Sequence, residues 1–314
     1  MRIGVLTNLR AGRVSPAAAR ARQLLAGQPD VRQRETRSSA EVDAALADFA
    51  RHGVELLVLN GGDGTLQRAL TRILDAEPGG WLPQLAPLRA GRTNTSALSL
   101  GADRDPGRGL AAILAAVENG TLESRAHTRP VLRADLGSDG VQYGMFFGAG
   151  MLYQAIRLTH ANFPDGRAQG HLGASLTTAA LVARGVLGRY GGVLSPEKVQ
   201  VAMDGVPVQP GEFLMVMATT LDRLFLRMRP FWGTQDAPLR FSTIAARPQG
   251  LRNVVRVLSG RPPVSRDEAY ISRNVDVVVL GLDGGMTVDG ELFEPQPGRT
   301  VEISAAKRVS FVRG

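Results

Sequence analysis

Two hydrophobic patterns alternate along the first 120 residues. The short apolar runs 3–7 and 54–59 have the length and composition of parallel strands that are buried on both faces of a sheet. Around them, apolar residues recur at helical spacing, and helix start and stop signals flank these segments. The predicted helices run from Ser15 to about Ala26, from 40 to 52, from 66 to 74 and from 106 to 118. Alternating strands and helices are typical of a three-layer parallel α/β domain.

The pattern changes after about residue 121. The runs 130–136 and 141–147 predict two strands joined as a hairpin across 137–140. Further strands are predicted at 199–203, 212–219, 239–245, 269–280, 300–303 and 308–312, and helices at 151–159, 175–190 and 249–258. Mostly antiparallel strands with long connections indicate a β-sandwich as the second domain.

Composition narrows the class of protein. The chain has 314 residues, 44% of them hydrophobic, which is enough for two globular domains. The absence of cysteine excludes disulfides, thiolate catalysis and cysteine-based zinc sites. No apolar run is long enough to span a membrane and no signal peptide is predicted, so we expect a cytoplasmic protein, with peripheral contact to the inner membrane face left open.

The charge points to an anionic partner. A formal net charge of +8 suits a nucleotide or an acidic membrane surface. No block of arginine and lysine is interleaved with aromatic residues, so binding of nucleic acid is not expected. The sequence leaves the oligomeric state open, a homodimer included.

The strand at 54–59 ends on a run of glycines around one acid, Asn60-Gly61-Gly62-Asp63-Gly64-Thr65. Glycine allows positive φ and lets a ligand approach the backbone closely, and the N-terminus of the helix that follows favours an anion. Because a carboxylate repels phosphate, Asp63 indicates that Mg²⁺ mediates binding of a nucleotide. A tight strand-to-helix turn without a ligand is the alternative interpretation.

This run resembles the GGDGT signature of the diacylglycerol kinase catalytic-domain superfamily. The superfamily includes bacterial lipid kinases, sphingosine kinases and ceramide kinases, and it is distantly similar to NAD kinases. The resemblance implies a Rossmann-like, NAD kinase-like α/β domain at 1–125 that binds nucleotide, with a C-terminal return at 300–314. It implies a β-sandwich domain at 126–299 that binds the lipid acceptor. ATP and Mg²⁺ are the implied cofactors, in the cleft between the domains.

Other loops resemble further nucleotide-binding elements of the family. Residues 8–13 are similar to the NPxAG element, with Leu9 in place of proline, and residues 87–101 are similar to the P-x-G-T-x-N-D element. In the second element Arg92 replaces a nucleotide-contacting threonine and Thr95 replaces an aspartate. Either Arg92 contacts phosphate directly, or it fills the site and weakens ATP binding. The resemblance implies these nucleotide-binding residues: Asn8, Gly12, Arg13, Thr36, Gly61, Gly62, Gly64, Thr65, Gly91, Arg92 and Asn94.

The turn Asp289-Gly290-Glu291 resembles the DGE element of the family. By this resemblance Glu291 is the general base that takes the proton of the lipid hydroxyl, and Asp289 and Asp63 complete the catalytic set. Taken alone, an Asp-Gly pair is also an ordinary hairpin turn. Asp236 falls where the family binds a supporting Mg²⁺, although Ala237 replaces a glycine there, and a surface turn is equally compatible.

Residues 221–232 alternate large apolar side chains with arginines. The alternation fits a segment that rests on an anionic membrane surface, and it also fits a half-buried strand with a basic outer face. His160 and His171 flank the stretch 162–173 and either contact the substrate or are solvated.

We interpret the chain as an ATP-dependent kinase acting on a diacylglycerol-like lipid. An NAD kinase-like enzyme with a soluble acceptor and a non-catalytic nucleotide-binding protein are the alternatives.

Overall fold

The computed structural model divides the chain into two units, Met1–Val131 with Lys307–Gly314, and Leu132–Ala306. The residues that it describes are 1–11, 21, 23–28, 30–75, 80–91, 93–162, 195–224, 228–246, 253, 256–257, 259–264 and 270–314. The predicted helix at 175–190 lies outside these residues, as do most of those at 15–26 and 249–258.

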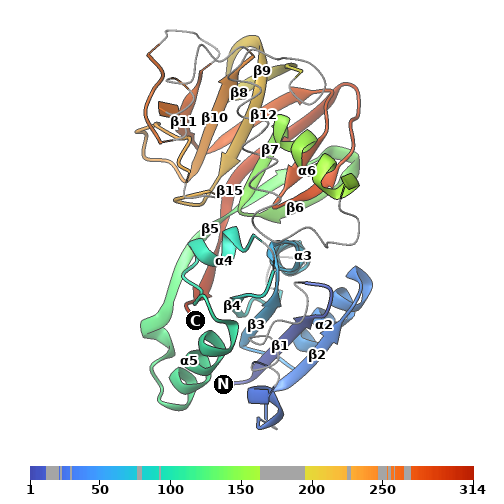
Figure 1. Ribbon diagram of the computed structural model, residues 1–314, viewed down its shortest axis with the longest axis vertical. Helices are drawn as coiled ribbons and strands as arrows, with labels where there is room; N and C mark the ends of the chain where they lie inside the picture. Colours follow the sequence, from blue (N-terminus) through green and yellow to red (C-terminus); the bar gives the residue numbers. More distant parts are fainter. Residues whose placement is uncertain are drawn as a thin grey trace. The chain divides into compact units, whose positions relative to one another are not determined.

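The first unit contains a parallel sheet (Figure 1). Its strands β1 (Ile3–Asn8), β2 (Arg32–Thr36), β3 (Leu56–Gly61) and β4 (Gln84–Arg89) lie in the order β4-β3-β1-β2. The last part of β15 (Arg299–Val312) pairs in parallel with β4. The strand β2 was not predicted, because its residues are mostly polar and exposed, as an edge strand allows.

Helices cover both faces of this sheet. The helix α5 (Pro106–Glu118) matches its predicted bounds and shares an apolar cluster with Leu56 and Val58 of β3. On the other face, Phe49 of α2 (Ser39–Arg51) lies so close to Gly4 of β1 that a Cβ there would be 3.0 Å from its ring. The helix α3 (Asp63–Leu74) packs beside α2, while α4 (Thr95–Ser99) and the short η1 (Leu122–Arg125) complete the unit. The three-layer α/β class is confirmed.

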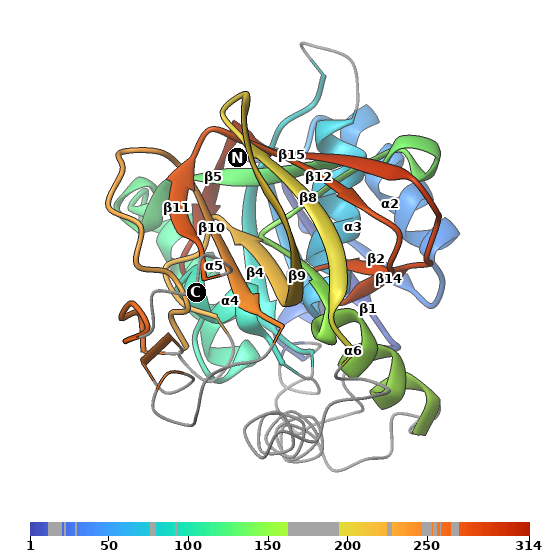
Figure 2. The same ribbon diagram turned by 90° about the horizontal axis from the view of Figure 1, so that it is seen from above.

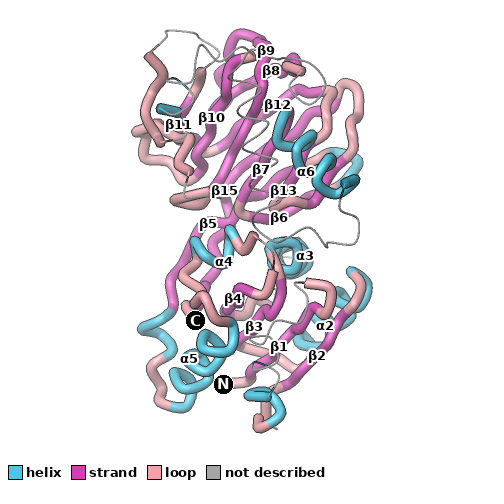
Figure 3. Tube along the Cα trace, in the orientation of Figure 1, coloured by secondary structure: helices cyan, strands magenta, loops and turns pink. Residues whose placement is uncertain are grey.

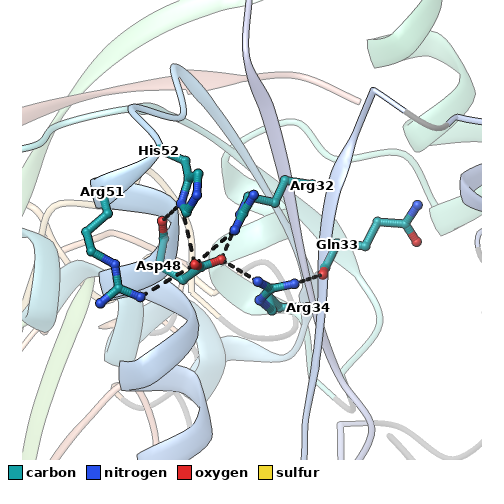
Figure 4. A network of polar contacts seen from close by, with 6 residues as sticks. All are labelled: Arg32, Gln33, Arg34, Asp48, Arg51 and His52. Carbon is teal, nitrogen blue, oxygen red and sulfur yellow. Dashed lines mark hydrogen bonds and ion pairs between the residues drawn. The ribbon is translucent and has the colours of Figure 1, made fainter.

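Asp48 of α2 ties the edge strand β2 to the helix layer (Figure 4). Arg32 donates to its carboxylate through Nε at 2.7 Å and through Nη2 at 3.0 Å, and Arg34 forms an ion pair at 2.7 Å. Arg51 and His52 approach the same carboxylate from its own helix. The hydrogen bonds from Arg32, together with the charge of Arg34, hold the pKa of Asp48 well below its usual range. Charged side chains along β2 also protect the open edge of the sheet from pairing with another strand.

Replacing Asp48 with asparagine should lower thermal stability in a pH-dependent way. Because the folded-state pKa is depressed, the carboxylate stabilises the fold fully above its unfolded pKa of about 4 and loses this effect as the pH falls through the folded value. The difference in Tm between wild type and Asp48→Asn should therefore be largest at neutral pH and shrink below about pH 4. Circular dichroism melts between pH 2 and 8 measure it, with the exposed Asp30→Asn as control. A constant difference at every pH would contradict the argument.

The second unit is built mostly of antiparallel strands (Figures 2 and 3). Strands β14-β13-β7-β9-β8-β12-β15 are neighbours in that order, β10 and β11 extend from β9, and β5 and β6 extend from β15. Their bounds are β5 (Ala126–Asp135), β6 (Val141–Gly144), β7 (Phe146–Gly150), β8 (Glu197–Met203), β9 (Val206–Thr219), β10 (Leu239–Ala245), β11 (Ser272–Val275), β12 (Val277–Leu282), β13 (Met286–Val288) and β14 (Glu291–Phe293). The helix α6 (Met151–Asn162) follows β7, and η2 (Gly137–Asp139) joins β5 to β6. One apolar cluster with side chains from most of these strands forms the core. The prediction of a mostly antiparallel second domain is confirmed.

Several predicted strand boundaries are wrong. The predicted strand 141–147 is divided between β6 and β7. The predicted strand 269–280 is split into β11 and β12, because the backbone N–H groups of Asp276 and Val277 donate to the side chain of Asp204 at the break. The two strands predicted at the end of the chain are the single strand β15, whose first half pairs with β12 and whose last part pairs with β4. In the described part of the chain, no helix is long and apolar enough to cross a membrane.

Candidate functional site

The order of strands in the first unit places a change in the direction of the connections at the carboxyl ends of β1 and β3. The chain leaves β3 into α3, which lies on the α2 face of the sheet. After β1 it leads to Ala21 and Leu25, which pack in the cluster of α5 on the opposite face. Adjacent strands whose connections leave toward opposite faces form a topological switch point, where α/β sheets bind ligands.

The glycine turn after β3 is tighter than predicted. Gly61 is the last residue of β3, Gly62 is the N-cap of α3, and Asp63, Gly64 and Thr65 form the first turn of the helix. None of the three glycines has a positive φ, so that reason for glycine does not apply here. Close packing requires it instead: a Cβ on Gly61 would lie 2.5 Å from Thr65 Oγ1, and one on Gly62 would lie 3.1 Å from the Cα of Gly91.

Asp63 joins the glycine turn to the segment after β4. Its Oδ2 accepts hydrogen bonds from Thr93 Oγ1 at 2.7 Å and from the Thr95 backbone N–H at 3.0 Å. Its Oδ1 accepts from the Ser96 N–H at 3.1 Å. These N–H groups are free donors at the start of α4, so Asp63 caps a helix that begins more than thirty residues later in the chain. This role of Asp63, and the part of Thr93 and Ser96, was not predicted.

Asn94 fixes the backbone that faces the glycine turn. Its Oδ1 accepts from the Gly91 N–H at 2.7 Å and its Nδ2 donates to the Gly91 carbonyl at 2.8 Å. Asn94 itself has φ of 50°, in the left-handed region that asparagine tolerates better than most residues. A Cβ on Gly91 would lie 2.4 Å from the Cα of Gly62, so the two turns meet backbone to backbone.

Gly91→Ala should therefore disrupt the site. The new methyl group forces the segments around Gly62 and Gly91 apart, and overpacking of this kind costs about 1–3 kcal/mol of stability. We expect a lower Tm and a nucleotide affinity reduced at least about tenfold, since the N-terminus of α3 is displaced. Thermal melts and calorimetric titration with ATP measure both effects. Gly27→Ala is the control, because a Cβ there meets nothing closer than 3.7 Å, and a Gly91→Ala variant that behaves like it would contradict the packing argument.

The predicted nucleotide-binding residues of β1 and β2 lie at the same edge of the sheet. Asn8 Nδ2 donates to Thr65 Oγ1 at 2.9 Å, and Asn8 Oδ1 accepts from the Arg10 N–H at 2.9 Å. The Leu9 N–H donates to the Thr36 carbonyl at 2.8 Å. The structure thus brings together Asn8, Thr36, Gly61, Gly62, Gly64, Thr65, Gly91 and Asn94. Gly12, Arg13 and Arg92 lie outside the described residues.

The predicted Asp289 turn is a β-hairpin between β13 and β14 in the second unit. Asp289 and Gly290 have φ of 49° and 95°, as a type I′ turn requires. Asp289 Oδ2 accepts from the Met145 N–H at 2.9 Å, and the Asp289 N–H donates to the Phe146 carbonyl, so Asp289 anchors the turn to the connection between β6 and β7. Glu291 is the exposed first residue of β14.

Two further predictions concern residues 221–239. Asp236 is exposed, and among the described residues no group of three acidic or histidine side chains could hold a metal ion. The strand interpretation of 221–232 is wrong for its described positions, which have no strand; Phe231 and Trp232 instead pack partly buried against an apolar cluster. Whether this segment contacts a membrane stays a prediction. The side chain of His160 and all of His171 lie outside the described part.

Comparison with known proteins identifies the first unit. Residues 2–123 match the model of the diacylglycerol kinase catalytic domain. Over these residues the chain is similar to this kinase family. The match covers the residues that lie together at the strand ends, which we call the strand-end site: Asn8, Thr36, Gly61, Gly62, Gly64, Thr65, Gly91 and Asn94. None of the curated proteins compared with the chain gives a match.

Solved structures share the fold of the whole chain. A diacylglycerol kinase from Bacillus anthracis str. Sterne has a TM-score of 0.67 and 18% identity, covering 100% of this chain and 97% of that one. An NAD kinase from Archaeoglobus fulgidus in complex with ATP has a TM-score of 0.50 and 12% identity, covering 99% and 93%. A yeast NADH kinase complexed with NADH has a TM-score of 0.51 and 11% identity, covering 100% and 84%. At these identities the likeness shows the fold.

Proposed function

We propose that the protein is an ATP-dependent kinase that phosphorylates a hydroxyl of a diacylglycerol-like or related lipid. The proposal rests on the arrangement of the strand-end site in the first unit. There the N-terminus of α3, without intervening side chains at Gly61 and Gly62, faces the carboxyl edge of the sheet at its switch point. Such a helix terminus binds the phosphates of a nucleotide, and Asn8 and Thr65 flank it.

Mg²⁺ fits the residues present. Mg²⁺ in kinases is held by one or two carboxylates together with the phosphates of the nucleotide. Asp63 is the carboxylate at the glycine turn, and its Oδ1 accepts only one hydrogen bond among the described residues, whereas Oδ2 accepts two. Asp63 would hold the ion through Oδ1. When bound, Mg²⁺ neutralises charge that develops on the transferred phosphoryl group.

Glu291 is proposed as the general base. Its carboxylate takes the proton of the lipid hydroxyl, the hydroxyl oxygen bonds to the γ-phosphorus of ATP, and the bond from the γ-phosphorus to the bridging oxygen breaks to release ADP. The type I′ turn and the bond from Asp289 to Met145 hold Glu291 at the exposed start of β14.

An apolar face in the second unit supports a lipid acceptor. The helix α6 and strands β9 and β10 contribute a buried cluster that is rich in methionine, an adaptable side chain for apolar ligands. Partly buried hydrophobic side chains pack against it, among them Phe146, Leu152, Leu224, Phe231, Trp232 and Tyr270. Partly buried apolar side chains of this kind suit contact with an acyl chain or a membrane surface.

Transfer of labelled γ-phosphate from Mg-ATP tests the proposal. The acceptor panel is diacylglycerol, monoacylglycerol, ceramide, sphingosine and phosphatidylglycerol in mixed micelles, with NAD as a soluble acceptor. We expect label in one of the lipids. Label in NADP would overturn the lipid assignment, and ATP binding without label in any product would overturn the kinase assignment.

A further inference from the structure

Asn60 is a buried residue whose side-chain amide uses its NH₂ group but, among the described residues, not its oxygen in hydrogen bonding. It is 3% exposed and lies on β3 immediately before the glycine turn. Its Nδ2 donates to Thr7 Oγ1 at 3.4 Å. Its Oδ1 is buried and has no hydrogen-bond partner in the part of the chain that the structure describes.

An unpaired buried acceptor is unfavourable unless another group donates to it. Neighbouring polar groups at the strand ends have partners already: Asn8 donates to Thr65, and Thr36 donates to the Thr7 carbonyl. Asn60 therefore differs from the residues around it, and a bound ligand would supply the missing donor.

The position of Asn60 restricts which ligand can do so. Asn60 pairs with Thr7 of β1, so its side chain lies at the switch point between β1 and β3. By the alternation along β3 it shares a face with Leu56 and Val58, whereas α3 packs on the other face. A ligand whose phosphates lie at the N-terminus of α3 would reach Asn60 with the group next to the phosphates.

We propose that Asn60 Oδ1 accepts a hydrogen bond from a ribose hydroxyl of the bound nucleotide. Ionised phosphate oxygens are acceptors and cannot satisfy a carbonyl oxygen, whereas the 2′- and 3′-hydroxyls can. The ribose is also the part of ATP that adjoins the phosphates. The inference rests on the proposed nucleotide site and adds a positioning residue for the nucleoside half of ATP.

Binding measurements on wild type and Asn60→Leu test this assignment. Calorimetric titrations use ATP, 2′-deoxy-ATP, 3′-deoxy-ATP and inorganic tripolyphosphate, each with Mg²⁺. We expect Asn60→Leu to weaken ATP binding about tenfold and to leave tripolyphosphate binding unchanged, since the only contact to the ligand that the variant loses is the one to the ribose. One of the two deoxynucleotides should bind wild type about tenfold more weakly than ATP and bind Asn60→Leu as ATP does.

Thermal stability separates this role from a structural one. Asn60→Leu removes an unpaired buried acceptor together with one long hydrogen bond, from Nδ2 to Thr7 Oγ1 at 3.4 Å, so the Tm of the unliganded protein should change little. Asn253→Ala is the matched control: Asn253 is 5% exposed and its Oδ1 accepts from the Val264 N–H at 2.9 Å. That variant should lower the Tm without changing the Kd for ATP.

Three results would overturn the inference while leaving the proposed function standing. They are an unchanged Kd for ATP in Asn60→Leu, equal weakening of ATP and tripolyphosphate, and full affinity of wild type for both deoxynucleotides. The last needs no variant, so it decides the matter even where Asn60→Leu does not fold. Failure of wild type to bind ATP at all would instead overturn the proposed function.

Discussion

Glu291→Gln should reduce phosphoryl transfer by about 10²- to 10⁴-fold, the usual contribution of a general base, and leave the Kd for ATP unchanged. Glutamine has the shape of glutamate but cannot take up the proton of the acceptor hydroxyl. Glu291 is exposed, so the substitution removes no packing. Among the described residues its carboxylate takes part in no hydrogen bond or ion pair, so a loss of activity would not follow from a lost structural contact.

The measurement is the rate of label transfer to the preferred lipid, with calorimetric ATP titration beside it. Glu212→Gln is the matched control, an exposed glutamate on β9 of the same unit, and it should retain full activity. The loss in Glu291→Gln should fall on kcat rather than KM for ATP, because a proton acceptor acts in the transition state. Transfer at the wild-type rate would rule out Glu291 as the base.

The sequence predicted the elements whose signals are local. The apolar runs of β1 and β3, the strand β10 and the helix α5 with Pro106 at its start were found because burial on both faces or a capped helix leaves a distinct pattern. The edge strand β2 was missed because half of its surroundings are solvent and its pattern is polar. The strand β15 was predicted as two because its partners β12 and β4 are far apart in the sequence.

The candidate site was predicted as a set of residues but not as a network. The glycines were attributed to backbone freedom, whereas Gly61 and Gly62 make room for Thr65 and Gly91. The contact between Gly62 and Gly91 joins segments about thirty residues apart, so no local pattern reveals it. Asp289 was placed beside the base as a catalytic group, and in the structure its carboxylate accepts from the Met145 N–H. Whether it also acts in catalysis stays a prediction.

Asp63→Asn should abolish transfer and also destabilise the first unit. The carboxylate accepts from three donors, Thr93 Oγ1 and the N–H groups of Thr95 and Ser96. Asparagine offers one oxygen and one NH₂ group, so at least one of these donors would face another donor. These hydrogen bonds are partly buried, so an unpaired donor among them costs up to about 1–3 kcal/mol, which corresponds to a fall of up to several degrees in Tm. The start of α4 would loosen, and ATP binding would weaken with it.

A matched variant separates the lost capping from the lost metal ligand. Asp43 accepts from Arg68 at 2.8 Å and 2.5 Å and also from Arg72, which ties α2 to α3 away from the strand ends. Asp43→Asn should lower the Tm similarly yet keep transfer at temperatures below its Tm. If Asp63 holds Mg²⁺, the wild type should bind ATP more tightly with Mg²⁺ than without it, and Asp63→Asn should bind equally in both conditions. An Asp63→Asn variant that keeps the full Mg²⁺ dependence would reduce Asp63 to a cap of α4, and the carboxylate that holds the ion would then have to be sought elsewhere in the chain.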